Sequence, residues 1–347
     1  MKSKNLSEKI LKSVKSKGFK YIELPSVIEA NHIVQRSGEN FRKFMFSFTD
    51  INGKELCLRP DLTIASCLRY LENNLKGKEK IFYNGQAYRK VQSKKDKIIR
   101  NQVGFEILGS KDEKKDDKEI INTSIKILQD LKFSSGTLTI GNIEIFNLLI
   151  SKLDIPKRWK LRLSRHFWRE EYFNDLLKRL ETNADIDPTI VEIDKKRYLD
   201  LLNKNPETMI AGRSVGEILK RFDTKIKDPR QAKRGNKVSK IIKSFLKISC
   251  PINKAAMELN KFFKKNKINL VVDQRYFPIS SNKLSKLNVK FSTSFGRHLE
   301  YYSGMVFKID VKSKLASIKC AGGRYDRLIS DLGSKKQVPA VGAAFNL

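Results

Sequence analysis

The sequence predicts an α+β fold, in which an antiparallel sheet is flanked by helices and interrupted by a helical insertion. Three observations support this class. Apolar and polar residues alternate in short segments toward both ends of the chain, as in strands with one buried face. An Asn52-Gly53 pair between two such segments is a strong hairpin signal. From residue 143 to about residue 265 the pattern is largely helical and punctuated by prolines.

The N-terminal segments fit this scheme. Apolar residues at helical spacing predict a helix over residues 6–17, and Gly18 is a natural end for it. A short strand is expected at residues 19–23. Segments 44–49 and 54–58 flank the Asn-Gly pair and predict a two-stranded unit.

That unit leads into residues 59–63 (Arg-Pro-Asp-Leu-Thr), which precede a predicted helix. Strands are then expected at residues 80–89 and 100–109, paired antiparallel across a polar loop. On the second strand Gln102 and Glu106 share a face, while the opposite face is apolar. An amide and a carboxylate on one face indicate that this face of the sheet forms part of a ligand-binding site.

The middle of the chain alternates charged and apolar stretches. Residues 112–118 are interpreted as a solvated charge run, followed by a helix over 120–131 and a strand at 137–140. The helical pattern of residues 143–265 predicts an insertion between two parts of the sheet domain. The sheet is expected to resume at residues 268–273.

Two C-terminal segments concentrate chemically useful side chains. Residues 295–307 (FGRHLEYYSGMVF) hold a cation, a carboxylate and two phenols before an alternating strand. Residues 320–328 (CAGGRYDRL) place paired glycines at a strand-to-helix turn, where a backbone can approach a ligand closely. A regular strand cannot aim Arg297 and Tyr302 at one ligand, so a bulge or turn near Gly296 or residues 303–304 is required.

Composition sets further bounds. The 347 residues are 40% hydrophobic and 31% charged, which describes a globular protein with a real core. No apolar run approaches a membrane span, and the start of the chain lacks the apolar region of a signal peptide. The four cysteines form no CxxC pair, so no metal site is expected. A reducing, cytoplasmic location is the expectation.

The formal net charge of +33 has two explanations. Lysines and arginines neutralise phosphates in nucleic-acid-binding proteins. Alternatively, the charge reflects a lysine-rich composition, which the spread of lysines along the chain and their excess over arginines favour. Nucleic acid is therefore not the expected partner. One helical pattern, with arginines at 158, 162, 165 and 169, is either a partner-facing helix or a solvated basic face, and we favour the second.

Taken in order, residues 59–63, the strand around residues 102–106, residues 297–304 (RHLEYYSG) and residues 322–326 (GGRYD) resemble the histidyl-tRNA synthetase family. The resemblance covers roughly residues 1–140 and 268–347. It implies a class II aminoacyl-tRNA synthetase-like fold, an antiparallel sheet flanked by helices. We expect a single synthetase-like domain over residues 1–347, with the helical insertion of 143–265 inside it and no anticodon-binding domain.

The sequence departs from those synthetases at positions that matter for catalysis. It stops just short of the arginine expected to bind ATP phosphates, and Val91 stands where an acidic residue is expected. Loss of a phosphate-binding arginine should cripple adenylate formation. In these respects the chain resembles the regulatory subunits of ATP phosphoribosyltransferase, a family that partners the short form of the catalytic subunit.

That resemblance implies a non-catalytic chain without cofactor that binds L-histidine and regulates the first step of histidine biosynthesis by feedback. It also implies self-association to at least a dimer, near residues 21–25, and assembly with the partner. A different class stays open: a divergent synthetase-like ligase that forms histidyl-adenylate or acts on RNA or protein. A basic RNA-binding scaffold without ligand is a third interpretation.

The resemblance also implies a set of histidine-binding residues. A zwitterionic amino acid needs acceptors for its ammonium and donors for its carboxylate, and an imidazole needs a partner for each nitrogen. Asp61 and Thr63 match the ammonium-binding positions, although both could simply cap a helix. Glu106 and Tyr302 match the pair that holds the imidazole. The remaining expected contacts are Gln102, Arg297, Tyr301 and Tyr325, with Arg89 as a possible relic of an ATP site.

Overall fold

The computed structural model describes residues 3–37, 39–73, 77–91, 97–133, 135–182, 188–210, 213–227, 232–279, 283–284, 287–296, 301–312 and 317–347. The residues group into two compact units, and each is described by itself. The first comprises Met1–Ile145, Ser249–Leu259 and Val272–Leu347, and the second comprises Phe146–Ile248 and Asn260–Val271.

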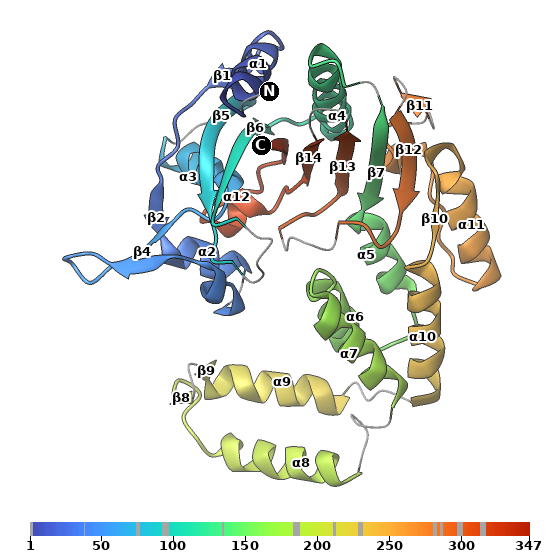
Figure 1. Cartoon of the computed structure of the whole chain (residues 1–347). Helices are drawn as coiled ribbons and strands as arrows, with labels where there is room; N and C mark the ends of the chain where they lie inside the picture. Colours follow the sequence, from blue (N-terminus) through green and yellow to red (C-terminus); the bar gives the residue numbers. More distant parts are fainter. Residues whose placement is uncertain are drawn as a thin grey trace. The chain divides into compact units, whose positions relative to one another are not determined.

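The first unit is organised by one large sheet (Figure 1). Among the described residues its strands follow the order β1-β5-β6-β15-β14-β13-β7-β12-β10, and β11 pairs with β12 at the side. The bounds are β1 (Lys20–Tyr21), β5 (Glu79–Tyr88), β6 (Ile99–Leu108), β7 (Gly136–Asn142), β10 (Ser249–Pro251), β11 (Lys283–Leu284), β12 (Leu287–Ser292), β13 (Met305–Lys312), β14 (Ser317–Arg324) and β15 (Ala340–Asn346).

Most neighbouring strands are antiparallel, as predicted. The exceptions are β1 with β5 and β12 with β7, which run parallel. The register sets two cross-strand pairs that matter below. Tyr83 on β5 lies opposite Gly104 on β6, and Glu106 on β6 lies opposite Gly342 on β15.

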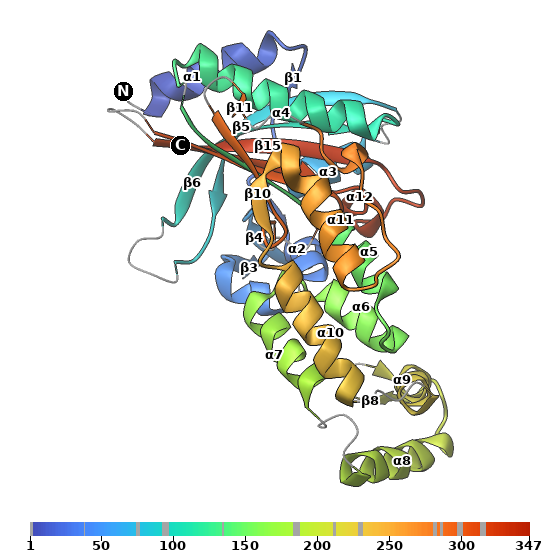
Figure 2. The same ribbon diagram turned by 90° about the vertical axis from the view of Figure 1, so that its right-hand side faces the viewer.

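Helices cover the two faces of this sheet (Figures 1 and 2). On one face lie α1 (Ser3–Lys15) and α4 (Glu113–Asp130), and on the other lie α3 (Leu62–Glu72) and α12 (Leu328–Asp331). Strand alternation sends Phe105 to the α1 side, where its ring meets that of Phe19 edge-on at 5.4 Å. The neighbouring Glu106 points the opposite way, toward α3. The large sheet is therefore apolar on one face and carries a carboxylate on the other.

A smaller sheet and a helix precede α3. The small sheet has the order β2-β4-β3, with β2 (Val27–Glu29), β3 (Ser47–Thr49) and β4 (Glu55–Leu58), and β2 continues into α2 (Ala30–Ser37). Strands β3 and β4 form the predicted hairpin, and Gly53 in its turn has φ +77°, which a side chain would disfavour.

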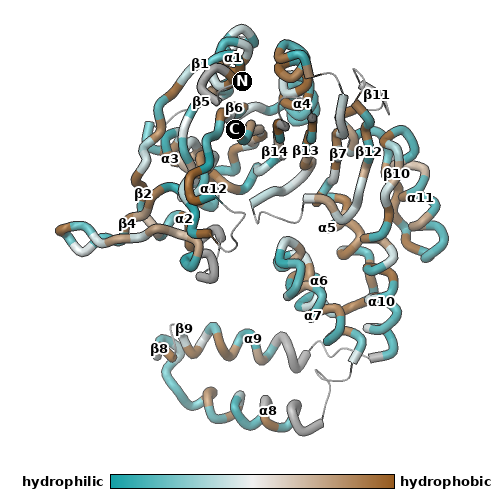
Figure 3. Tube along the Cα trace, in the orientation of Figure 1, coloured by the Kyte–Doolittle hydropathy of each residue, from teal (hydrophilic) through white to brown (hydrophobic). Residues whose placement is uncertain are grey.

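The second unit is mainly helical. Its aromatic centre stacks Phe146 on Phe167 at 3.7 Å and packs Phe173 and Phe245 around them. Figure 3 shows hydrophilic and hydrophobic residues interspersed along α9, as in an amphipathic helix. The elements of this unit are α6 (Lys157–Arg165), α7 (Glu170–Glu181), α8 (Pro188–Leu202), β8 (Met209–Ile210), β9 (Arg213–Ser214), α9 (Val215–Lys227) and α10 (Ala232–Phe245).

Two helices contribute residues to both units. These are α5 (Ile143–Lys152) and α11 (Ala255–Lys265), and each changes unit part-way along its length. The expected arrangement, a single domain over 1–347 with an insertion at 143–265, stays a prediction.

Two local expectations need correction. Residues 112–118 are a solvated charge run only in part: most of them are exposed at the start of α4, but Asp116 is only 1% exposed. Its carboxylate accepts a hydrogen bond of 2.7 Å from Lys78 Nζ. Residues 268–273 form no strand, since this segment has no strand beside it to pair with, and the sheet resumes at β10 and β12 instead. Alternation alone cannot tell a paired strand from an extended connection.

A buried arginine ties α4 to the end of β14. The Arg324 guanidinium donates to Asp117 at 2.8 Å, to Asp326 at 2.8 Å and to the Glu113 carbonyl at 2.8 Å. Burial raises the pKa of Asp117 to about 6, although the neighbouring Arg324 favours the charged form. Asp326 also accepts a bond from the Ala340 backbone N–H, which links the network to β15.

We predict that Arg324→Gln destabilises the chain by about 3–5 kcal/mol, because it leaves two buried carboxylates without their cation. The free energy of unfolding in urea measures this. The matched control is Arg327→Gln, at an exposed arginine one turn away, which should change that energy by no more than about 0.5 kcal/mol. Equal losses in both variants would contradict the assignment of Arg324 as the organising cation.

Candidate functional site

The site centres on the carboxylate of Glu106, which is 1% exposed in the middle of the sheet. Three hydroxyl groups donate to it. Thr63 on α3 reaches Oε1 at 3.0 Å, Tyr83 on β5 reaches Oε1 at 2.7 Å, and Tyr325 reaches Oε2 at 2.6 Å from the turn after β14. A buried carboxylate requires such donors, because unmet acceptors in the interior are costly.

Glycines on the neighbouring strands make room for this cluster. A Cβ atom on Gly342 would overlap the Glu106 carboxylate, and one on Gly104 would overlap the Tyr83 ring. A Cβ atom on Gly323 would come within 2.9 Å of the Tyr302 ring. The glycines in the GGRYD segment and in the last strand therefore serve the site by lacking side chains.

Asp61 lies beside this cluster at the start of α3. Its Oδ1 atom caps the helix by accepting a bond of 3.0 Å from the Ile64 backbone N–H. Its Oδ2 atom faces the site, where it accepts a 3.3 Å bond from the Tyr301 hydroxyl and lies 3.8 Å from Arg89 Nη2. The capping role and a ligand-binding role are compatible, because each uses a different oxygen.

Tyrosine rings form a wall next to the two carboxylates. The Tyr301 ring meets the Tyr302 ring at 5.0 Å and the Tyr325 ring at 5.9 Å, both edge-on. Both Tyr301 and Tyr302 precede β13 and lie outside any regular strand, as the alternation argument required. Within the described residues, the hydroxyls that bond Glu106 come from Thr63, Tyr83 and Tyr325, and Tyr302 is not among them.

The structure brings together Asp61, Thr63, Glu106, Arg89 and the three expected tyrosines. Gln102 lies elsewhere: it is four residues from Glu106 along β6 and donates to Asn346 Oδ1 at 2.7 Å near the end of the sheet. Arg297 falls outside the described residues.

Sequence reasoning missed Tyr83. The signal for its role is its position opposite Gly104, which only the strand register reveals. The role of Arg59 was missed as well. This buried arginine donates to the Gln86, Leu24 and Pro25 carbonyls and so fastens β5 to the segment before β2.

The electrostatics follow from burial. Burial raises the pKa of Glu106 to about 7, although the bonds from Tyr325, Tyr83 and Thr63 favour its charged form. Burial also raises the pKa values of Tyr83, Tyr301 and Tyr325, so these hydroxyls stay protonated and can donate. The result is a carboxylate that can exchange its proton near neutral pH, surrounded by neutral donors. This arrangement suits a ligand that brings its own N–H groups.

A family model described as "Histidyl-tRNA synthetase" matches residues 1–347. The chain belongs to the histidyl-tRNA synthetase family. Among its members, two curated relatives are described as "ATP phosphoribosyltransferase regulatory subunit". The one from Agrobacterium fabrum is 28% identical over 92% of this chain and 89% of its own length. The one from Allorhizobium ampelinum is 28% identical over 96% of this chain and 93% of its own length.

Solved structures of this family confirm the predicted class II synthetase-like fold. One is titled as an ATP phosphoribosyltransferase regulatory subunit/histidyl-tRNA synthetase from Bacillus halodurans. It has a TM-score of 0.57 and 21% identity, over 99% of this chain and 76% of that one. The histidyl-tRNA synthetase from Nostoc sp. PCC 7120 has a TM-score of 0.57 and 16% identity, over 98% of this chain and 68% of that one. The predicted resemblance to regulatory subunits of this family is confirmed by the curated relatives.

Two further observations on the described residues concern membrane-spanning helices and metal-binding groups. No described helix is long and apolar enough to cross a membrane. The described side chains also contain no group of three or more His, Cys, Asp or Glu residues that could hold a metal ion.

The raised pKa of Glu106 predicts a pH-dependent stability. Between pH 4.5, the ordinary pKa of the unfolded group, and about 7, the folded chain holds a proton that the unfolded chain has released. The free energy of unfolding should therefore fall across this window, by up to roughly 3 kcal/mol. Glu106→Gln should remove the Glu106 part of this fall and leave the part that the raised pKa of Asp117 contributes, whereas Glu72→Gln, at an exposed position on α3, should keep the whole fall. Urea unfolding at several pH values measures the difference, and identical profiles for wild type and Glu106→Gln would refute the assignment.

The close approach of Gly342 to Glu106 yields a second prediction. Gly342→Ala should push the carboxylate from its donors and destabilise the chain by about 1–3 kcal/mol, as overpacking does. Gly216→Ala in α9 is the control, because the nearest atom to its added Cβ is 3.5 Å away and alanine favours a helix. Thermal unfolding of both variants should show a loss at position 342 and none at 216.

Proposed function

We propose that the chain is a non-catalytic regulatory subunit of ATP phosphoribosyltransferase, and that L-histidine binds at the Glu106 site. The single observation that carries the ligand assignment is the pairing of two carboxylates with different surroundings. Glu106 is buried among hydroxyls, and Asp61 presents one oxygen beside an arginine and a tyrosine. Histidine has a positive ammonium group and an imidazole N–H, which need two separate acceptors.

In this proposal Asp61 and Thr63 bind the ammonium group. The Oδ2 atom of Asp61 is not used by the helix cap, so it can exchange its Tyr301 partner for the ligand. Ammonium–carboxylate bonds are charge-assisted and stronger than the hydroxyl bond they would replace.

Glu106 then accepts from the imidazole, and Tyr302 closes the other side of the ring. Glu106 already accepts three hydroxyl bonds, two at Oε1 and one at Oε2, and a carboxylate can accept about four, so in this proposal the imidazole N–H takes the remaining position on Oε2. The ligand would thereby be joined through Glu106 to Thr63 on α3 and to Tyr325 in the turn after β14. A ligand regulates an assembly only if it binds two of its states differently, and a displacement of α3 or of that turn between states would alter these contacts.

The regulatory rather than catalytic role rests on the relatives. The proteins described as regulatory subunits align with more than nine tenths of this chain. In addition, Val91 is half exposed where the synthetases carry an acidic residue. The proposed partner is the short-form catalytic subunit of ATP phosphoribosyltransferase, in a cytoplasmic assembly that also contains at least two copies of this chain. The competing proposal, from the same family, is a divergent ligase that forms histidyl-adenylate.

The test combines this chain with a short-form catalytic subunit from the same source and follows phosphoribosyl-ATP formation with and without L-histidine. We expect activity that needs both chains and falls when histidine is added. Glu106→Gln should weaken histidine binding by about tenfold or more, because a charged acceptor is lost. The control Glu72→Gln, on the exposed side of α3, should bind histidine like the wild type.

Two outcomes would overturn the proposal. The first is no stimulation, with the two chains migrating separately on a sizing column. The second is histidine-dependent exchange between ATP and pyrophosphate by this chain alone, which would establish the ligase instead. Calorimetric titration with L-histidine separates the ligand assignment from the partner assignment, because it needs no second protein.

A further inference from the structure

The second unit contains a pocket whose lining is strongly cationic. It has a volume of about 710 Å³ and lies between α6 and α9. Helix α6 contributes Arg158, Arg162 and Arg165, and α9 contributes Lys220 and Arg221. One carboxylate, from Glu217, faces these five cations.

The spacing on each helix explains why the cations converge. Arg158, Arg162 and Arg165 recur at intervals of four and three residues, so they share one face of α6. Glu217, Lys220 and Arg221 share a face of α9 in the same way. The solvated basic face that the sequence favoured is therefore one wall of a concave site.

Part of this wall is held in place by the protein. Arg162 donates to the Tyr172 hydroxyl at 2.9 Å, and its guanidinium lies 5.5 Å from the centre of the buried Trp159 ring. Such contacts order the guanidinium before any ligand arrives, which lowers the entropic cost of binding.

Two of the five cations are not neutralised within the part of the chain that the structure describes, because no carboxylate there forms an ion pair with Arg165 or Arg221. Like charges at neighbouring helix positions repel one another. The concentration of positive charge also affects His166 at the end of α6. Burial, together with the charges of Arg169, Arg165 and Arg162, lowers the pKa of His166 to about 4. A bound anion would relieve the repulsion.

We propose that this pocket binds a di- or triphosphate group, either free pyrophosphate or the phosphates of a nucleotide. Arginine is suited to phosphate because its planar donors engage two oxygens at once. The volume falls within the range of small-molecule sites, and its concave shape favours a compact ligand over an extended nucleic-acid strand. Leu161, which is exposed, also lines it and supplies an apolar surface against which a base could lie. This proposal does not depend on the proposed regulatory function.

The experiment is calorimetric titration of the full chain with pyrophosphate, ADP, ATP and inorganic phosphate at one ionic strength. We expect saturable binding of the di- and triphosphates, at least about tenfold tighter than that of phosphate. Equal affinities for pyrophosphate and ATP would assign recognition to the phosphates alone. Tighter binding of ATP than of pyrophosphate would indicate an additional contact between the base and the apolar surface of the pocket.

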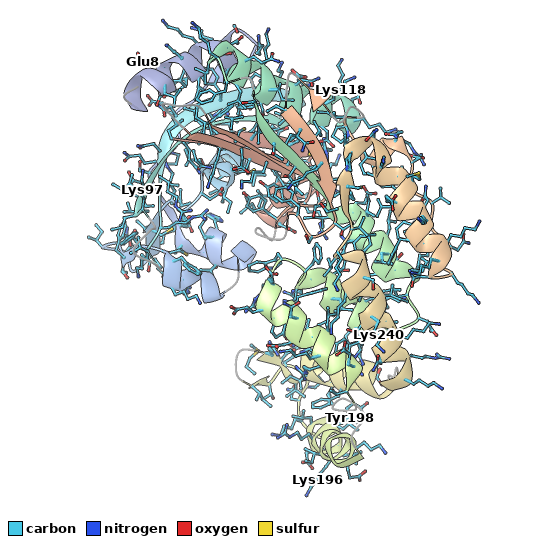
Figure 4. The ribbon with its side chains drawn as sticks, turned by 45° about the vertical axis from the view of Figure 1, so that its right-hand side comes forward. Glu8, Lys97, Lys118, Lys196, Tyr198 and Lys240 are labelled. Atoms are coloured by element: carbon cyan, nitrogen blue, oxygen red, sulfur yellow. The ribbon has the colours of Figure 1, made fainter. Side chains whose placement is uncertain are left out.

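Two charge-matched double variants test the location. Arg165→Gln with Lys220→Gln removes exposed cations from both walls and should weaken ATP binding by at least about tenfold. Lys196→Gln with Lys240→Gln removes the same charge from α8 and α10, outside the pocket lining, and should change it by less than about twofold (Figure 4). Circular dichroism checks that both double variants fold. If the pocket double variant does not fold, the single variant Arg221→Gln replaces it in the test.

Three results would overturn the proposal. One is the absence of saturable binding by any of the four ligands. Another is an equal loss in both double variants, which would show that only the overall charge of the chain attracts phosphate. The third is a short RNA that binds more tightly than ATP, loses affinity in the pocket variant and is not displaced by pyrophosphate. That result would assign the cations to a nucleic acid.

Discussion

Burial of the Glu106 carboxylate is the constraint on which the centre of this structure depends. A carboxylate in the interior needs donors from several directions, and here they arrive from α3, from β5 and from the turn after β14. Each donor fixes the position of its own element. The strand register must also place glycines opposite the bulky side chains of the cluster. Gly342 lies opposite Glu106 and Gly104 lies opposite Tyr83, and a side chain at either glycine would collide with its partner. One acidic residue thus links parts of the chain separated by more than two hundred positions.

A second buried carboxylate shows what is distinctive about Glu106. Asp117 lies against the guanidinium of Arg324, so its charge is balanced by a cation belonging to the protein itself. Glu106 is surrounded by neutral hydroxyls, so the charge that appears on its deprotonation is left for something else to balance. The first arrangement leaves no charge to be balanced, whereas the second leaves the charge of Glu106 available to a ligand. This contrast is the physical reason for proposing a ligand at Glu106 and not at the Arg324 network, although both involve residues 324–326.

Much of the site was predictable from sequence because its residues sit in short motifs with a fixed local geometry. Asp61 and Thr63 lie at the start of a helix, and Tyr325 lies in a strand-to-helix turn. The alternation of residues along β6 predicts on which face of the sheet the Glu106 side chain lies. Tyr83 could not be found this way, because its role depends on which strand lies opposite. Asp116 and Asp117 were misread for a related reason: a run of charges reveals nothing about the buried Arg324 or the Lys78 that meets them. The strand expected at residues 268–273 failed because an alternating pattern does not supply a neighbouring strand.

The two units therefore carry opposite chemistries. The first places acidic acceptors among hydroxyls, and the second gathers cations from two helices around one carboxylate. The two proposed ligands, an amino acid and a polyphosphate, would use different residues, so each site can be altered without removing a proposed contact from the other. Any effect of one ligand on the affinity for the other would then be a coupling free energy transmitted through the chain, equal in both directions. Reciprocal titrations would measure that coupling, and independent affinities would mean that the two sites act separately.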